Sequence, residues 1–287
     1  KEVWLNVPFL FARDGIGLLI LYLLGFGYLS HALQLKLGSH EPQGKIRQAI
    51  FRVWQQKHLP ADEIRRKMTV WGGLYILAFA LVLSLVGFDL VMSMDPHWIS
   101  TLFGAYHFIK TFFVGLGGLI ILAAIAHTRN GDRSQLTSAH FHDIGKLFFG
   151  FCLLWADFFY VQLLVIYYGN IPEETYYVIV RTMLAPWNKL AWIVFFVCFI
   201  GPFFILLNKN VKTRPILMAA ICAIVIVGIW FEHLLLLGPA LSRGASSIPL
   251  SISDGLISFG FLGLMLLAIH TFFNVFPELY GVEKVAS

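Results

Sequence analysis

The chain has 287 residues, of which 58% are hydrophobic and 13% charged, and its mean hydropathy is +0.76. Because charged residues usually make up about a quarter of a soluble domain, this composition excludes a water-soluble globule, and it also excludes disordered and fibrous proteins. The net charge of +5 indicates membrane topology and calls for no nucleic-acid partner. The three cysteines lie in apolar runs without CxxC or CxxCH spacing, so no disulfide, iron-sulfur cluster or c-type haem is predicted.

Apolar runs bounded by charge predict an all-α integral membrane protein, a single multi-pass domain over residues 1–287. Between the first two spans, residues 34–69 are predicted to form a basic cytoplasmic loop. Within the fifth span, Gly201-Pro202 predicts a kink, and the carbonyl freed by the proline must find a partner inside the protein. The first residues lack a signal-peptide pattern and an initiating Met, so we expect the chain to begin partway into a longer product. The seven predicted spans are 15–33, 70–92, 103–126, 144–168, 190–207, 215–240 and 254–276.

The distribution of positive charge predicts the orientation of these spans. Seven spans put the two termini on opposite sides of the membrane, with five Lys and Arg residues on the N-terminal side and fifteen on the other. The positive-inside rule therefore places 34–69 and the C-terminus in the cytoplasm, and the N-terminus with loops 93–102, 169–189 and 241–253 outside.

The loop that begins at Gly169 carries a helix-start pattern. Pro172 followed by Glu173 and Glu174 is typical of the first turn of a helix, because proline tolerates that turn and acids complement the helix dipole. We expect a short interfacial helix here, with nearby tyrosine and tryptophan side chains in the aromatic belt at the membrane surface. These aromatic residues are Tyr176, Tyr177, Trp187 and, on another loop, Trp98.

Ionisable residues inside the spans are the candidate functional residues, because a carboxylate at the bilayer centre costs about 2.5–3.5 kcal/mol even on the lenient insertion scale. Asp157 lies near the middle of the fourth span, and Tyr160 and Gln162 extend a polar track from it. Asp89, His107, Lys110, Glu232 and His233 occupy the outer halves of other spans. Together these six residues predict a zone for proton transfer or quinone contact, since a carboxylate beside an imidazole can accept and relay protons.

Three other interpretations of the same residues remain open. In the first, Asp157 only hydrogen-bonds a neighbouring helix and serves helix packing. In the second, Lys110 only forms a buried salt bridge with Asp89 or Glu232. The third is a haem site. His107 and His233 lie at similar depth on different helices, the minimum requirement for the two axial ligands of a b-type haem. A second such group at the other ends of the spans comprises His31, His127 and His270.

Several segments carry a resemblance to a known family. They are LNVPF at 5–9, FDLVMSMDPHWIST at 88–101, DIGKL at 143–147, LWA at 154–156 and QLLVIYYGNIPEET at 162–175. With them the chain resembles the ActF-type membrane subunit of alternative complex III, a quinone-related relative of the NrfD and polysulfide-reductase membrane proteins. It departs from that pattern at Asp157, where an aromatic residue is expected, at Val161, where a serine is expected, and at Phe231-Glu232-His233-Leu234.

The resemblance implies a location in the bacterial cytoplasmic (inner) membrane, a fold, partners and a function. The family usually has ten helices, two four-helix bundles and a pair, so it implies three N-terminal spans beyond these seven. It also implies a subunit of a quinol-oxidising respiratory complex that binds no redox centre or metal of its own but contacts quinone or quinol. Its partners would be a related NrfD-like quinol-oxidising subunit, an iron-sulfur protein and a multihaem cytochrome c. The alternatives are a structural scaffold subunit of such a complex and a haem-carrying membrane cytochrome.

Overall fold

The computed structural model describes residues 4–37, 45–55, 59–96, 98–131, 136–242, 244 and 246–280, and the regular elements among them are all helical. Seven helices are long and apolar enough to cross a membrane, which confirms the predicted fold class. Five spans are single helices: α1 (Val7–Leu37), α4 (Phe103–Asn130), α5 (Ser138–Gly169), α10 (Pro215–Leu241) and α11 (Ile252–Val275). The span Ala61–Met94 consists of α3 (Ala61–Val86), η1 (Gly87–Val91) and η2 (Met92–Met94). The span Trp187–Leu207 consists of α7 (Trp187–Phe195), η4 (Phe196–Ile200) and α8 (Gly201–Leu207). The shorter helices are α2 (Lys45–Gln55), α6 (Pro172–Thr182), α9 (Lys209–Lys212) and η5 (Pro277–Tyr280).

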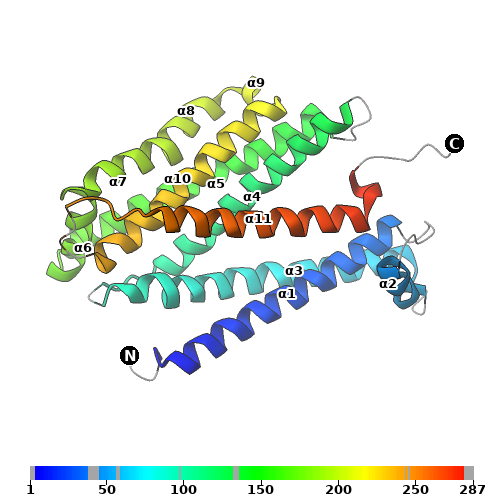
Figure 1. Cartoon of the computed structure of the whole chain (residues 1–287), viewed down its shortest axis with the longest axis horizontal. Coiled ribbons are helices and arrows are strands. Elements are labelled where there is room, and N and C mark those ends of the chain that lie inside the picture. The colour runs from blue at the N-terminus through cyan, green and yellow to red at the C-terminus, as the bar shows by residue number, and fades with distance from the viewer. Residues whose placement is uncertain are drawn as a thin grey trace.

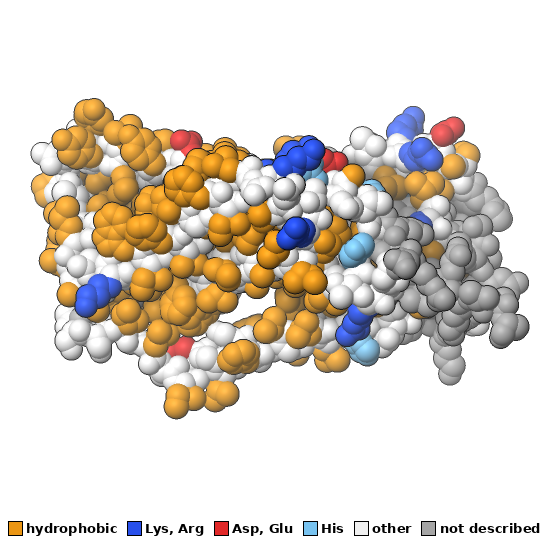
Figure 2. All heavy atoms as spheres, turned by 90° about the horizontal axis from the view of Figure 1, so that it is seen from above, with side chains coloured by type: hydrophobic (Ala, Val, Ile, Leu, Met, Phe, Trp, Pro, Cys, Tyr) orange, Lys and Arg blue, Asp and Glu red, His pale blue; other side chains and the backbone are white. Residues whose placement is uncertain are grey.

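The long helices run roughly along one axis, and the start of α1 and η5 lie at opposite ends of the molecule (Figure 1). The main core is formed by α4, α5, the α7–α8 span and α10, whose inward-facing aromatic and aliphatic side chains make one cluster. Helix α1 packs along α3, and α3 in turn packs on α4. Figure 2 shows most Lys and Arg side chains of one face toward the end that carries α2, and hydrophobic side chains spread widely over that face. We call the two ends of the bundle the α6 end and the α2 end.

The predicted loop 34–69 is largely helical where the structure describes it. Helix α1 continues to Leu37, α2 spans Lys45–Gln55, and α3 begins at Ala61, while 38–44 and 56–58 lie outside the described residues. Phe51 and Trp54 of α2 pack with Leu33 and Leu37 of α1 and with Phe276, forming a second, smaller core. The basic segment therefore contains an amphipathic helix anchored against the α2 end of the bundle.

The predicted break in the fifth span is a π-helical turn. Residues Phe196–Ile200 form this turn immediately before Gly201-Pro202. Pro202 has no N–H to donate to the carbonyl four residues earlier, that of Cys198. The thiol of Cys152 on α5 lies 3.4 Å from this carbonyl oxygen and donates to it. The freed carbonyl is thus satisfied by a neighbouring helix, as the membrane environment requires.

Helix α6 forms where the sequence predicts it, with Pro172 in its first turn. Asn170 ends α5 in the left-handed conformation, at φ 45°, and this turns the chain into α6. The prediction of four aromatic residues in a belt at the membrane surface is largely wrong, because only Tyr176 of the four is exposed. Trp98 and Tyr177 stack face to face with ring centroids 3.8 Å apart, and Trp187 is also buried. These aromatics pack the α6 end of the core instead of facing lipid.

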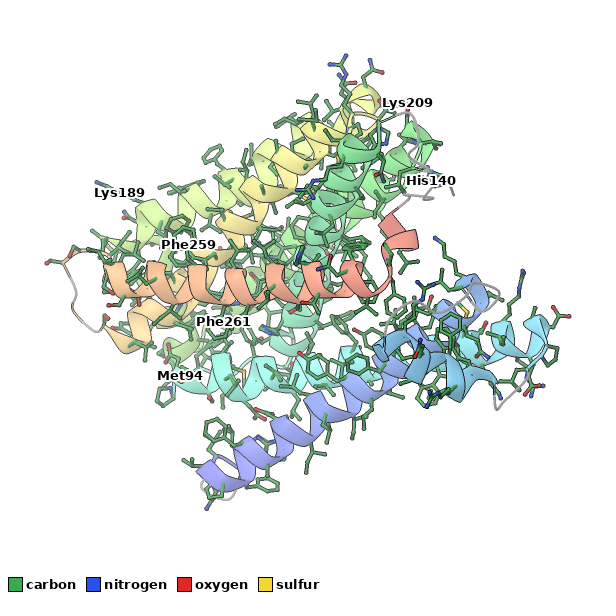
Figure 3. The ribbon with its side chains drawn as sticks, turned by 45° about the vertical axis from the view of Figure 1, so that its right-hand side comes forward. Met94, His140, Lys189, Lys209, Phe259 and Phe261 are labelled. Atoms are coloured by element: carbon green, nitrogen blue, oxygen red, sulfur yellow. The ribbon has the colours of Figure 1, made fainter. Side chains whose placement is uncertain are left out.

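Helix α11 lies across the bundle with little of its surface covered. None of its residues is buried, and Ile252, Phe259 and Phe261 are between 71% and 84% exposed. In Figure 3, Phe259 and Phe261 extend from opposite sides of this helix. The contacts that hold it include a hydrogen bond from Trp230 to Ser258, at 3.2 Å, and Phe272 near its C-terminal end, which packs against the second core.

Candidate functional site

Helices α4 and α10 bring three polar side chains together at the α6 end of the core. Tyr106 and Lys110 stand four residues apart, so they share the face of α4 that packs against α10. The Tyr106 hydroxyl donates a hydrogen bond to Oε1 of Glu232, and Lys110 Nζ lies 3.3 Å from Oε2 of the same carboxyl group. All three side chains are almost completely buried. We refer to Tyr106, Lys110 and Glu232 as the Glu232 cluster.

The contact between Lys110 and Glu232 is an incompletely hydrogen-bonded pair. The two atoms approach without hydrogen-bond geometry, so Lys110 Nζ and Glu232 Oε2 keep unused hydrogen-bonding capacity among the described residues. A buried ion pair recovers its desolvation cost only when its hydrogen bonds are complete. Moving one proton from the ammonium to the carboxylate would turn this ion pair into a neutral pair. The cluster can therefore hold or release a proton with small changes in geometry.

Two histidines extend the cluster along the same pair of helices. The rings of His107 on α4 and His233 on α10 meet edge to face, with centroids 6.4 Å apart. His233 Nδ1 lies 2.9 Å from the Ile229 carbonyl oxygen, which orients the ring, while His107 Nδ1 is buried without a hydrogen-bond partner in the described part of the chain. The backbone of η1 fits closely over His107, since a Cβ added at Gly87 would lie 2.7 Å from it. The predicted residues His107, Lys110, Glu232 and His233 are thus brought together.

Asp89 belongs to a second buried cluster on α1 and η1. Arg13 makes an ion pair with its carboxylate and donates from Nε at 3.0 Å, and Trp4 Nε1 donates to Oδ1 at 2.9 Å. The carboxyl group of Asp14, which is 5% exposed, lies against that of Asp89. Neither carboxyl oxygen of Asp14 has a hydrogen-bond partner among the described residues. Lys110 was expected to pair with Asp89 or Glu232; the structure pairs it with Glu232 and gives Asp89 the partner Arg13.

The structure places Asp157 apart from both clusters. Its side chain is exposed on the outer face of α5, beside Tyr160, and it makes no hydrogen bond or ion pair with the described part of the chain. Gln162 points elsewhere, into a small internal cavity. The polar track predicted along α5 is therefore divided between two faces of that helix.

Arg181 lies between the outer surface and the buried core at the α6 end. It is 5% exposed, pairs with Asp95 at 3.4 Å and donates to the Leu236 carbonyl at 2.7 Å, while its Nε has no partner among the described residues. Its guanidinium stacks over Tyr177 at 3.4 Å. Burial lowers the pKa of Arg181 and raises the pKa of Tyr177 to about 12. Tyr177 is therefore neutral and Arg181 charged at physiological pH.

Two cavities meet at Arg181 and Tyr177. The outer one, of about 520 Å³, lies between α6 and the end of α10 and includes Asp95 and Glu173 in its walls. The inner one, of about 40 Å³, is also lined by Tyr106, Gln162 and Thr182. The residues that line this inner cavity are mostly apolar, so its walls give ordered water few hydrogen-bond partners. The outer cavity thus approaches the Glu232 cluster through Arg181, the inner cavity and Tyr106.

A third cavity, of about 390 Å³, lies between α10 and α11 and is lined by His233, Trp230, Ser258 and Asp254. Its volume falls in the range of small-molecule sites, and its wall combines apolar side chains with a few polar groups. His233 therefore faces the Glu232 cluster on one side and a potential ligand space on the other.

The second group of histidines does not come together. His31 stacks on Trp71 and His127 packs against Phe141, while His270 Nε2 lies 2.9 Å from the side-chain amide nitrogen of Asn274. Among the described residues, no group of three or more His, Cys, Asp or Glu side chains could hold a metal ion. Of the two histidine groups, only His107 and His233 are adjacent.

Sequence reasoning missed Tyr106, Arg181, Arg13 and Asp14. Tyr106 was detectable from its spacing of four residues to Lys110. Arg13, Asp14 and Arg181 were missed because spans were bounded at charged residues, a rule that assigns any ion pair near a helix end to a loop. For Arg181, no feature of the sequence distinguishes an arginine at the membrane surface from a buried one.

No protein-family model matches this chain, and no curated protein matches its sequence. The fold and the sequence together establish a multi-pass membrane protein with seven candidate spans. Its function is therefore argued from the geometry of the site.

Proposed function

We propose that the chain is a membrane subunit of a quinol-oxidising electron-transfer complex of the alternative complex III type, and that its Glu232 cluster transfers protons. The observation that carries this proposal is a fully buried Glu–Lys–Tyr group with two adjacent histidines in a transmembrane bundle. Ionisable groups at such positions are rare and mark proton or substrate pathways. The resemblance in sequence supplies the class of complex and its partners, the related quinol-oxidising subunit, the iron-sulfur protein and the multihaem cytochrome c.

Each residue has a role in this proposal. His233, at the wall of the α10–α11 cavity, accepts a proton from a quinol hydroxyl whose ring occupies that cavity. His107 and Lys110 pass the proton to Glu232, whose carboxyl group accepts a hydrogen bond from Tyr106 at the wall of the inner cavity. Arg181 lies between this inner cavity and the outer one and, by its fixed charge, opposes the passage of free cations. In the predicted orientation, the proton leaves on the outer face of the membrane.

The test is Glu232→Gln in the assembled complex, reconstituted in vesicles. Glutamine keeps the acceptor for Tyr106 but cannot take up a proton, so we expect quinol-dependent electron transfer to fall by roughly a hundredfold or, where electron transfer continues, fewer protons to be released per electron. Glu63→Gln is the matched control, since Glu63 forms only a surface pair with Lys67 at 3.0 Å. The measurements are the rate of acceptor reduction and the acidification of the vesicle exterior or lumen.

The outcomes separate proton transfer from a purely structural role. If Glu232→Gln lowers the amount of complex but leaves the rate and the proton yield per complex unchanged, Glu232 only holds α4 against α10 and the chain is a scaffold subunit. Unchanged yield, rate and proton release together would remove the Glu232 cluster from the mechanism.

The second candidate is a b-type haem, which is favoured by one observation. His107 and His233 are adjacent on facing helices, with ring centroids 6.4 Å apart, and histidine is a common axial ligand of haem iron. A reduced-minus-oxidised absorption spectrum of the purified chain decides this point. A haem band that disappears in both His107→Ala and His233→Ala would replace proton relay with haem ligation as the role of the histidines.

A further inference from the structure

Asp157 is an acid that lies well inside the bilayer and faces away from its own protein. Helix α5 spans Ser138–Gly169, so Asp157 lies about 5 Å from the middle of the helix, at 1.5 Å per residue. The hydrocarbon core extends about 15 Å to each side of its centre. The side chain is exposed, as are Leu153, Leu154 and Tyr160 around it. It is therefore too deep to reach a lipid headgroup region by bending its short side chain.

The surface around Asp157 is hollowed. A groove of about 650 Å³ runs between α5 and the α7–η4 segment. Its walls include Ala156, Phe159, Tyr160, Phe195 and Phe199. Ala156 beside the acid leaves room for a close approach of another backbone, as small residues do in packed membrane helices. The groove therefore has room for a neighbouring transmembrane helix, and one charged side chain, Asp157, lines it.

We propose that this groove docks a transmembrane helix of another subunit, and that this helix presents a Lys or Arg side chain at the depth of Asp157. A carboxylate facing lipid is costly, whereas pairing with a basic residue between helices removes both charges from hydrocarbon. Charge complementarity also argues against a second copy of this chain as the occupant. Two copies related by a two-fold axis would bring two Asp157 side chains toward each other.

The inference does not depend on proton transfer by the Glu232 cluster. Within the described chain Asp157 contacts no member of that cluster, so a docking role and a proton-transfer role can fail separately. Because Asp157 also has no hydrogen-bond or ion-pair partner among the described residues, its replacement should leave the fold of the chain itself unchanged.

The first experiment maps the occupant of the groove in native membranes. A photo-crosslinking amino acid is introduced into the tagged full chain at Tyr160 or Phe195, and at Leu81, a 73% exposed residue of α3, as the control position. We expect the groove positions to capture one transmembrane peptide of a different subunit with a Lys or Arg within about one helical turn of the link. Adducts of lipid alone, of a second copy, or of a peptide without a basic residue would overturn the proposal.

The second experiment tests the charge. Asp157→Leu should lower the ratio of cross-linked partner to chain by roughly tenfold, because the basic side chain is left unpaired. Asp157→Glu should retain most of the partner. The level and thermal stability of the chain should be unchanged in both variants, and the turnover per fully assembled complex should equal that of the natural chain. A partner ratio that is the same for Asp157→Leu and the natural chain refutes the docking site and leaves the Glu232 result standing.

Discussion

Cys152 shows how one side chain repairs a break in another helix. Its thiol is fully buried and donates to the Cys198 carbonyl that Pro202 leaves free. A free backbone carbonyl in a membrane interior is costly, and a thiol is a weak but apolar donor that suits this environment. The sequence predicted the break from Gly201-Pro202, but it could not identify the donor, because the donor lies on a different helix 46 residues away.

Replacing Cys152 tests this contact. Cys152→Ala removes the donor, and Cys152→Ser retains one, so we expect the serine variant to be the more stable by about 1 kcal/mol. Burial of a serine without a partner would give the opposite order. Thermal unfolding of the two variants in detergent, followed by tryptophan fluorescence, gives the comparison directly.

Tyr177 predicts a pH dependence at the α6 end. Burial raises its pKa from 10.0 to about 12, so the folded state keeps the phenol proton that the unfolded chain loses. The resulting stability is fully present below pH 10 and is lost as the pH rises from 10 to 12. Between pH 10 and 12 we expect the free energy of unfolding of the natural chain to fall by up to about 2–3 kcal/mol more than that of Tyr177→Phe. Parallel pH profiles for the two proteins would contradict this.

At the scale of the residue, the sequence predicted the types of groups in the site better than their partners. Lys110, Glu232, His107 and His233 are recognisable because they interrupt apolar runs. Their pairing depends on the rotation of α4 against α10, which periodicity does not determine. The separation of Asp157 from the rest has the same cause, since an acid in a span can face the core or the lipid.

At the scale of the element, glycine contacts decide how closely α10 can approach the α7–α8 span. A Cβ added at Gly238 would lie 2.2 Å from the Trp187 ring, and one at Gly228 would lie 2.5 Å from the Cys198 sulfur. By contrast, Gly115 and Gly118 have nothing within 4 Å of their Cβ positions, although they stand in the most glycine-rich stretch of α4. The density of glycines in the sequence therefore does not by itself locate the close helix contacts.

This contrast gives a matched pair of substitutions. Gly238→Ala should lower the stability by about 1–3 kcal/mol, because Trp187 must move. Gly118→Ala should be neutral or stabilising by up to about 1 kcal/mol, because alanine favours the helix and meets open space. Melting temperatures in detergent measure both. Equal effects of the two substitutions would mean that α7 and α10 do not pack as described.

The spans themselves were predictable from the length of their apolar runs, which is set by bilayer thickness. Their ends were less predictable. Helix α1 begins at Val7 and α3 at Ala61, each well before the predicted span, because ion pairs such as Arg13–Asp89 and surface pairs such as Glu63–Lys67 allow charged residues within a helix. Charge ends the apolar run but does not end the helix.

At the scale of the whole molecule, the orientation stays a prediction that counts positive charge by position along the chain. Two of the residues counted on the N-terminal side, Arg13 and Arg181, are each paired with an acid, Asp89 and Asp95 respectively. Figure 2 shows most Lys and Arg side chains of the face it presents toward the α2 end. The helix neighbours, in contrast, required the structure, since short loops are compatible with several arrangements.

Orientation can be measured with single cysteines. The three natural cysteines are buried, so they provide a silent background. We expect a membrane-impermeant thiol reagent added outside the cell to label Ser247→Cys, in the loop between α10 and α11, and not Asn210→Cys, in α9 at the other end. Labelling of Asn210→Cys alone in intact cells would reverse the assigned orientation and place the outer cavity in the cytoplasm.

The two π-helical turns, Gly87–Val91 and Phe196–Ile200, each hold one residue more than an ordinary helical turn. Deleting the extra residue from either would restore an ordinary helical turn and leave the orientation of the remainder of that span nearly unchanged, because the wider turn already absorbs that residue. In the first turn the change would be confined to the residues around Asp89 and its pairing with Arg13, and in the second to those around the Cys198 carbonyl and Cys152. Related sequences that lack one residue at these points would then preserve the spans and alter only the polar contacts at the turn, so alignment gaps here report on chemistry rather than on topology.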